Sequence, residues 1–504
     1  MLTEKYFVSI LRNLGVIIMG NNNFQIEEIT ISKAHEAIKN GEISFKKLIE
    51  MYMERINKYD KKLNSIIMIN PKALKVAEDM DEEYKRTKIL KPLQGIPVML
   101  KDNIDTKDMP TTAGSIALKG VMPWKDSFIV NKLIDGGAII LGKVNLHEFA
   151  VWGETASSIL GQTLNPYDRT RTPGGSSGGT SASVASNFGI IGIGTDTINS
   201  VRSPASACSL VGLRPTVGLV SRTGIVPYSM TQDTAGPIMR TVEDTAMVLD
   251  IIAGYDMEDP ITFQAKEHIP KSYTDYLNKN GLEEKRIGIL HSFFGTEDIH
   301  QEVNGIVMNI LDMAKERGCV LIDIEENIST DDLVKNVSLH LYELKSHLNL
   351  YLKELGQASE VHSLEDLINS GKYHKGIDEN IKYAQTLDVN SDEYKERLIK
   401  RENLQNTVIE IMEKYNLDAI AYPHQKRPVV KVGETQVDRN GVLGSVTGFP
   451  SIVIPAGFTK PTDTAPIGVP VGVEFLGKRW SEPRLIEIGY ALEQISKARK
   501  MPVL

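Results

Sequence analysis

Residues 173–179 read Pro-Gly-Gly-Ser-Ser-Gly-Gly, and they are the most informative stretch of this 504-residue chain. Four glycines and two serines in seven residues cannot serve a hydrophobic core, but they permit a sharp turn and a close approach of backbone N–H groups to a ligand. A P-loop needs Lys and then Ser or Thr after its second glycine, whereas Gly179 is followed by Thr180 and Ser181. A flexible linker fits poorly, because strand-like and helix-like segments flank the stretch closely. The stretch therefore predicts a tight loop at a ligand site, followed by a closely packed helix.

Two further segments place polar residues at the end of an apolar run. Residues 194–202 read Gly-Thr-Asp-Thr-Ile-Asn-Ser-Val-Arg, and residues 95–103 read Gly-Ile-Pro-Val-Met-Leu-Lys-Asp-Asn. Lys101 ends the second run, where a charged amine is unfavourable unless it is paired or neutral. A buried lysine near hydroxyl groups can have a lowered pKa and act as a base. Taken alone, Lys101 is better explained as a solvated charge at a strand end.

Short apolar runs between about residues 90 and 254 indicate the fold class. They are too short for buried helices and are typical of buried strands, with helical segments between them. The runs are Ile96–Leu100, Ala138–Leu141 and Ile190–Ile193. We therefore predict an α/β fold with a layered α/β/α core, in which helices cover a large, mixed, twisted sheet.

The pattern along the chain predicts four regions. Residues 1–88 form an N-terminal helical region that packs on the core, and residues 89–285 form the core with the three segments above. Residues 286–416 contain a small strand-helix-strand unit and then a charged helical insertion that is almost free of Gly and Pro. Residues 417–504 return to the core sheet and end in an amphipathic helix.

Composition excludes several classes of protein. Lys and Arg number 57 against 65 Asp and Glu, so the net charge of −8 gives no footprint for nucleic acid or an anionic membrane. Cys208 and Cys319 are too few for a disulfide scaffold or a Cys-rich zinc site, and they predict reduced thiols in a cytoplasmic protein. His147-Glu148 does not begin an H-E-x-x-H zinc motif, because Val151 stands at the second His position, so no metal site is expected.

The N-terminus needs a separate interpretation. Residues 6–19 are largely apolar and loosely resemble a signal peptide, but Arg12 and Asn13 interrupt them and no small-residue cleavage site follows. Translation from Met19 is an alternative, which would leave the first 18 residues outside the native protein. No run of 18 apolar residues occurs elsewhere, so we expect no membrane span.

Together, the three segments resemble the amidase signature family. In that family a Lys ends a strand in a G-x-P-x-x-x-K-D-N motif, which Lys101 matches. The first Ser of G-G-S-S-G-G follows a cis peptide bond in the family, which corresponds to Ser176. The family's nucleophile lies 24 residues further along in a G-T-D-x-x-x-S-x-R context, which corresponds to Ser200. The likeness covers about residues 90–254 and 417–494.

The resemblance implies a Ser–cis-Ser–Lys triad that needs neither metal nor cofactor. Neutral Lys101 would be the base, Ser176 would relay the proton, and Ser200 would attack the amide carbonyl to form an acyl-enzyme. The oxyanion hole would consist of the backbone N–H groups of Thr197, Ile198, Asn199 and Ser200. Ser177, Asp196 and Arg202 are candidates for positioning the triad. The alternative is that they serve only hydrogen bonding in the loops and the core. The family usually has Gly-Gly before its nucleophile, so Ile198-Asn199 narrows the acyl pocket and bears on the substrate.

Three functions fit this resemblance. The first is a stand-alone amidase that converts a carboxylic or peptide amide to an acid plus ammonia or an amine. The second is the glutaminase subunit of a tRNA-dependent amidotransferase, which shares the triad but needs partner subunits; segments 342–349 and 472–477 look more like stand-alone members. The third is a non-enzymatic binding protein, against which the intact triad argues. The expected partner is a small-molecule amide, without nucleic acid or membrane. The sequence does not identify the natural amide, and it is compatible with a homodimer.

Two histidines are predicted to play no part in the site. His340 and His347 lie seven residues apart on a charged helical segment, and this pattern predicts that both face solvent. Ser200 is not in a G-x-S-x-G elbow, so nothing in the sequence indicates a Ser-His-Asp triad.

Overall fold

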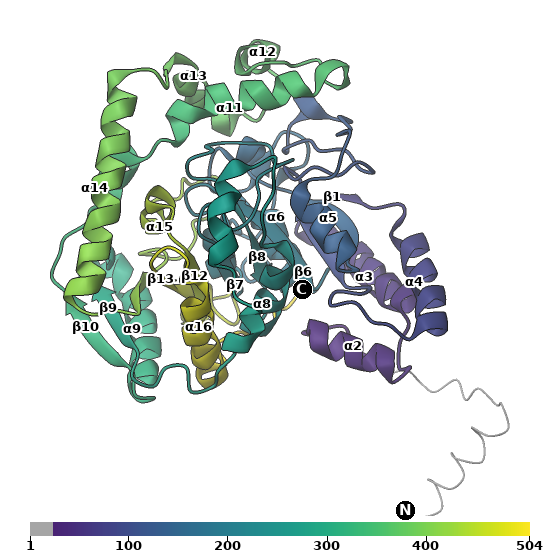
Figure 1. Ribbon diagram of the computed structural model, residues 1–504, viewed down its shortest axis with the longest axis horizontal. Coiled ribbons are helices and arrows are strands. Elements are labelled where there is room, and N and C mark those ends of the chain that lie inside the picture. The colour runs from purple at the N-terminus through teal and green to yellow at the C-terminus, as the bar shows by residue number, and fades with distance from the viewer. Residues whose placement is uncertain (1–23) are drawn as a thin grey trace, which may run out of the picture.

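A single mixed sheet runs through the computed structural model, which describes residues 24–504 (Figure 1). Within these residues the sheet has eleven strands. From one edge to the other they are β1 (Ile66–Ile69), β3 (Ile139–Val144), β2 (Pro97–Lys101), β6 (Ile191–Asp196), β8 (Thr234–Met239), β7 (Val211–Arg214), β12 (Ser451–Phe458), β13 (Pro470–Leu476), β11 (Ala419–Pro423), β9 (Arg286–Leu290) and β10 (Val320–Ile324). A small separate hairpin pairs β4 (Ala156–Ser157) with β5 (Gly161–Gln162). The question of a signal segment or of a start at Met19 lies outside the described residues.

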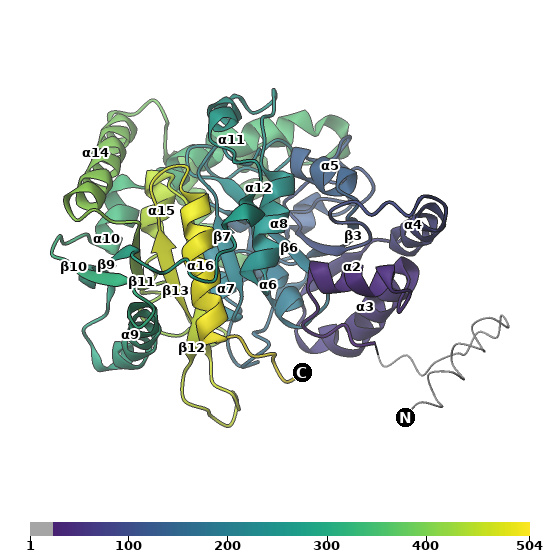
Figure 2. The same ribbon diagram turned by 60° about the horizontal axis from the view of Figure 1, so that its bottom comes forward.

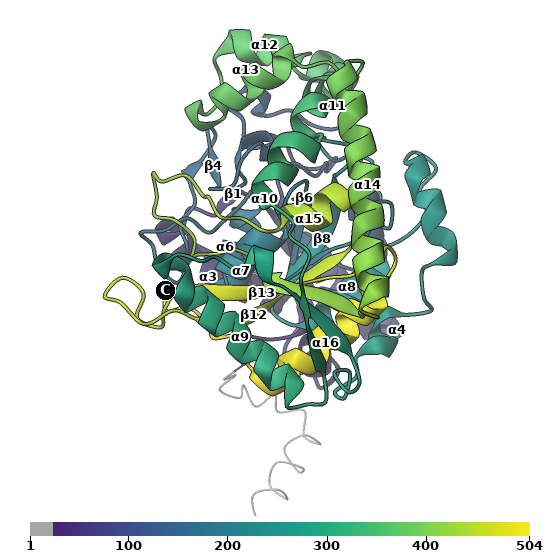
Figure 3. The ribbon, with the colours of Figure 1, turned by 90° about the vertical axis from the view of Figure 1, so that its left-hand side faces the viewer.

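Helices pack on both faces of this sheet. They are α2 (Ile31–Lys39), α3 (Phe45–Tyr59), α4 (Ala73–Thr87), α5 (Phe128–Asp135), α6 (Gly178–Ala185), α7 (Arg202–Ala207), α8 (Val242–Ile252), α9 (Gln301–Lys315), α10 (Thr330–Asp332), α11 (His340–Glu354), α12 (Leu364–Ser370), α13 (Asp378–Thr386), α14 (Asp392–Lys414), α15 (Val442–Thr447) and α16 (Glu482–Ser496). Figure 3 shows the strands between α9 and α16 on one side and α7 and α15 on the other. The predicted layered α/β/α class is therefore confirmed.

The register of the central strands places the candidate site. β2 pairs in parallel with β6, and Leu100 lies opposite Ile193. Parallel neighbours end at the same edge of a sheet. Lys101, which ends β2, therefore lies beside Thr195 and Asp196, which end β6. The polar residues at the ends of these two apolar runs are thus close together.

The segment from 331 to 415 is helical, as predicted. α11, α12 and α13 lie across one end of the core, and α14 runs back beside β9 and β10 (Figures 1 and 2). Leu344 and Leu348 of α11 are buried in one cluster with Phe149 and Tyr228 of the core. This cluster holds the helical segment against the core. No helix within residues 24–504 is both long and apolar enough to cross a bilayer.

One strand lies in the N-terminal stretch predicted as helices. β1 pairs antiparallel with β3, so this region contributes an edge of the sheet as well as α2, α3 and α4. Its four residues are half-buried and too few to show a periodicity, which is why the helical prediction was wrong here.

Candidate active site

Lys101 is fully buried at the end of β2, and within residues 24–504 its amine hydrogen-bonds only to neutral oxygens. Its Nζ lies 2.7 Å from Ser176 Oγ, 2.8 Å from Thr195 Oγ1 and 3.3 Å from the Thr195 carbonyl oxygen. A neutral amine has two N–H groups and one lone pair, so it can donate to both Thr195 oxygens and accept the Ser176 proton. Burial lowers the pKa of Lys101 to about 7, although the charges of Asp196 and Asp233 act in the opposite direction. A large fraction of the amine is therefore neutral near pH 7.

The Gly-rich loop brings Ser176 to this lysine. The Gly175–Ser176 peptide bond is cis, as the resemblance implies, and Gly174 has a φ of +73° that favours glycine. Ser177 ties the loop to both neighbouring segments, because its N–H donates to the Ser200 carbonyl (3.2 Å) and its Oγ donates to the Thr195 carbonyl (3.2 Å). Gly179 allows the closest approach, since a Cβ there would lie 2.2 Å from the Asn145 carbonyl oxygen.

Ser200 lies between β6 and α7 and lines a small cavity. It is 6% exposed, which is enough for contact with a ligand in that cavity. Among residues 24–504, no hydrogen bond joins Ser176 Oγ to Ser200 Oγ, while the Ser177–Ser200 backbone bond holds the two loops together. The step between Ser176 and Lys101 is therefore present as a hydrogen bond. The step between Ser200 and Ser176 stays a prediction.

The peptide groups before Ser200 are oriented by their carbonyls. Gln232 Nε2 donates to the Thr197 carbonyl (3.2 Å), and Arg202 Nη2 donates to the Ile198 carbonyl (2.8 Å). In a trans peptide the next N–H points opposite to the carbonyl. Within residues 24–504, the N–H groups of Ile198, Asn199 and Ser200 make no hydrogen bond. Such free, fixed donors are what an oxyanion hole requires.

A buried ion network lies directly behind this loop. Arg202 makes two hydrogen bonds to Asp196 (3.1 and 3.0 Å) and pairs with Glu474, while Arg214 reaches Asp196 at 2.9 Å. All four side chains are fully buried. Burial alone would raise the pKa of Asp196, but the charges of Arg202 and Arg214 hold it well below its usual range. Because Val201 N–H also donates to Asp196 (3.0 Å), the network fixes the start of α7 next to Ser200.

Several residues of the site carry no signal in the sequence. Gln232 is one: its Oε1 accepts from Leu339 N–H (2.7 Å) and from Ser338 Oγ (3.1 Å), so it joins the helical insertion to the loop before Ser200. Glu343 of α11 is another, because its carboxylate accepts from Ser229 Oγ at 2.6 Å and so holds the loop that contains Gln232. Both lie on segments far from 173–200 in the chain, and only the tertiary fold brings them near.

The prediction that His340 faces solvent was wrong. His340 lines the cavity with Ser200, and burial lowers its pKa to about 3, with help from the positive charges of Arg439 and Arg397. Its Nδ1 lies 2.7 Å from Ser338 Oγ, and its ring meets the edge of Tyr228. His347 is also partly covered, and its Nδ1 accepts from Met230 N–H (3.2 Å). The prediction failed because the charge pattern of this helix does not indicate which of its faces packs against the core.

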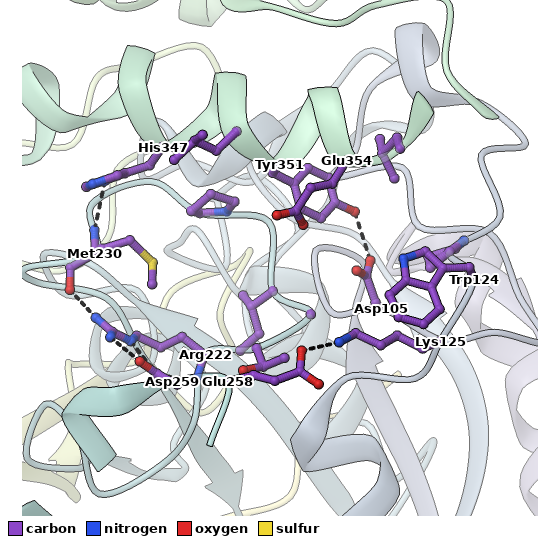
Figure 4. A pocket seen from close by; sticks show the side chains of 17 residues that line it. Asp105, Trp124, Lys125, Arg222, Met230, Glu258, Asp259, His347, Tyr351 and Glu354 are labelled. Carbon is purple, nitrogen blue, oxygen red and sulfur yellow. Dashed lines mark hydrogen bonds and ion pairs between the residues drawn. The ribbon is translucent and has the colours of Figure 1, made fainter. Parts of the chain in front are cut away.

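Of the cavities described near this centre within residues 24–504, two have room for more than a single water molecule. The one beside Ser200 has a volume of about 70 Å³. It is lined by Ala150, Val151, Trp152, Thr197, Ile198, Asn199, Ser200, Tyr228, Val334, His340, Arg439 and Val442. A larger cavity of about 260 Å³ opens beneath α11, between Trp124 and His347, and none of the three triad residues lines it (Figure 4). Its polar groups bind one another, as Tyr351 donates to Asp105 (2.9 Å) and Arg222 pairs with Asp259. The smaller cavity is therefore the candidate substrate site.

Comparison with known proteins agrees with this geometry. The family model described as Amidase matches residues 47–486. The chain belongs to the amidase signature family. A probable amidase of Arabidopsis thaliana is 38% identical over 96% of this chain and 93% of its own length. This amidase-family chain also resembles the native peptide amidase of Stenotrophomonas maltophilia, with a TM-score of 0.84 at 34% identity over 95% of this chain and 99% of that chain.

A second group of relatives carries a different name. The A subunit of the glutamyl-tRNA(Gln) amidotransferase of Thermoanaerobacter pseudethanolicus is 33% identical over 95% of this chain and 98% of its own length. Family membership therefore makes this protein a hydrolase that acts on carbon–nitrogen bonds, and it leaves the substrate open.

Proposed function

We propose that this protein is a stand-alone serine amidase with Ser200 as nucleophile, Ser176 as proton relay and Lys101 as base. The observation that carries the proposal is the buried amine of Lys101, which has no carboxylate partner among residues 24–504 and lies 2.7 Å from Ser176 Oγ. A lysine without a counter-ion in a buried position favours its neutral form, which is the form that accepts a proton.

The reaction follows from these positions in two halves. Ser200 Oγ attacks the amide carbon while its proton passes to Ser176 and the Ser176 proton passes to Lys101. The oxygen of the tetrahedral intermediate is stabilised by the predicted oxyanion hole, the backbone N–H groups of Thr197, Ile198, Asn199 and Ser200. Those of Ile198, Asn199 and Ser200 make no hydrogen bond within residues 24–504, and each such donor is commonly worth about 3–4 kcal/mol. Ser176 then returns a proton to the departing nitrogen, the C–N bond breaks, and ammonia or an amine leaves. Water attacks the acyl-enzyme along the same proton path and releases the acid.

The cavity favours a stand-alone amidase over a glutaminase subunit. Glutamine carries an α-ammonium group, which a binding site ordinarily pairs with a carboxylate. None of the residues lining the cavity beside Ser200, all within the described part of the chain, is Asp or Glu. The Arabidopsis and Stenotrophomonas relatives, which are named as amidases, support the same choice.

A hydrolysis screen tests this function. The purified protein alone is incubated with aliphatic, aromatic and peptide carboxamides and with glutamine, and ammonia release is measured. We expect turnover of at least one carboxamide class without any added subunit, and little or none of glutamine. Glutamine hydrolysis that appears only with two copurifying subunits would favour the amidotransferase role. Absence of all turnover and of fluorophosphonate labelling would favour a binding protein.

A further inference from the structure

Arg439 brings an unpaired guanidinium to the cavity beside Ser200. It is partly buried, and its guanidinium carbon lies 4.9 Å from the centre of the Trp152 ring. Within residues 24–504, no carboxylate forms an ion pair with Arg439, and no acceptor takes a hydrogen bond from its side chain. By contrast, Arg427 on the same segment pairs with Asp438 at 3.2 Å. Arg439 therefore keeps its fork of N–H donors available to a ligand.

A second unused donor lines the same cavity. Asn199 is 2% exposed, and its Nδ2 has no hydrogen-bond partner among the described residues. A buried amide donor without a partner is unfavourable by about 1–3 kcal/mol in an empty site, so it marks a place where a ligand acceptor would be stabilised. Asn199 immediately precedes Ser200, at a position where the family usually has glycine.

The cavity beside Ser200 carries positive charge only among its lining residues. Of the lining residues, Arg439 is the one ionised near pH 7, because burial lowers the pKa of His340 to about 3 and raises that of Tyr228 far above its usual value. The acid whose charge acts on Arg439 is Glu154, which does not line the cavity. Its carboxylate already accepts hydrogen bonds from Trp152 Nε1 (2.8 Å) and from a backbone N–H. The cavity thus offers a positive charge and free donors, and none of its lining residues is Asp or Glu.

We propose that Arg439 and Asn199 bind a carboxylate on the acyl part of the substrate, so that the preferred substrates are monoamides of short dicarboxylic acids. This inference rests on the proposed amidase function and adds its substrate class. The acyl group stays on Ser200 after the nitrogen leaves, and the cavity that Ser200 shares with Arg439 and Asn199 is where it would lie. A volume of about 70 Å³ corresponds to a few water molecules, so we expect the preferred acyl chain to be short.

Succinamate and succinamide test the inference as a matched pair. They differ only in that a terminal carboxylate replaces a carboxamide of nearly the same shape. For the wild-type protein we expect kcat/KM to be at least about tenfold higher on succinamate, since a hydrogen-bonded charge contributes more than a neutral partner. In Arg439→Met the ratio should fall to near one, and Arg439→Lys should retain part of it. Arg427→Met, an arginine change on the same segment but outside the cavity, should leave the ratio unchanged.

The outcomes separate the two proposals. Equal or poorer turnover of succinamate by the wild-type protein would overturn the carboxylate inference without any variant, while leaving the amidase function in place. A preference that survives in a folded Arg439→Met would also overturn it. If no carboxamide at all is hydrolysed and Ser200 takes no fluorophosphonate label, the amidase function itself fails, and the inference fails with it.

Discussion

Ser200→Ala should reduce carboxamide hydrolysis by roughly 10⁴-fold or more, because it removes the oxygen that forms the acyl-enzyme bond. The side chain lines the cavity, and the loss of a single hydroxyl at a 6% exposed position should leave the fold intact. The residual rate would come from the N–H donors of the neighbouring loop and from substrate binding. The measurement is ammonia release from the best carboxamide of the screen, with circular dichroism and thermal melting to show that the variant is folded.

Ser181→Ala is the matched control for this variant. Ser181 is also a buried serine, on α6 directly after the Gly-rich loop, and its Oγ has no hydrogen-bond partner among the described residues. Its replacement should leave turnover within about twofold, as expected for a side chain outside the reaction. Normal turnover by a folded Ser200→Ala protein would show that another residue is the nucleophile.

Asp196→Asn should destabilise the folded protein by about 3–5 kcal/mol, because it removes one partner of a buried ion network. The change leaves Arg202 and Arg214, both fully buried, without the charge that lies between them. Glu474 still pairs with Arg202, so the loss falls mainly on Arg214. We expect the thermal midpoint to drop by several degrees and activity to fall with it, since the same carboxylate fixes the turn before α7.

Asp323→Asn is the control for charge removal at the surface. Asp323 pairs with His291 at 2.6 Å, but its side chain is 78% exposed. Exposed pairs contribute about 0–1 kcal/mol, so this variant should melt within a degree or so of the wild type. Melting of Asp196→Asn at the same temperature as Asp323→Asn would mean that the buried network does not support the loop around Ser200.

Two of the three segments that carry the candidate reacting groups could be predicted because each directly follows a short apolar run. Lys101 ends β2, and the segment with Ser200 follows β6, so a parallel pairing of those runs was enough to bring them to one sheet edge. The third segment, around Ser176, was marked by its own glycines and serines and not by an apolar run before it. The local pattern therefore indicated the fold class and the three segments, and the resemblance to the amidase signature family gave Lys101, Ser176 and Ser200 their predicted roles.

The rest depends on contacts that no local pattern records. β8 contains Gly236 and Pro237, which interrupt its apolar run, so the periodicity did not indicate a central strand there. His340 and Arg439 reach the cavity from segments more than a hundred residues beyond Ser200, and neither lies in a motif. Substrate recognition is consequently the part of the site that sequence alone could not supply.

The most direct test of the account is the pH dependence of fluorophosphonate labelling, with the modified serine located by mass spectrometry. Burial lowers the pKa of Lys101 to about 7, so its amine is protonated and inactive as a base below that pH and neutral above it. We predict that Ser200 is the labelled residue, that the labelling rate rises with pH around a midpoint near 7, and that Lys101→Met labels slowly with no such rise. Label on another serine, or the same pH profile in a folded Lys101→Met protein, would contradict the proton path from Ser200 through Ser176 to Lys101.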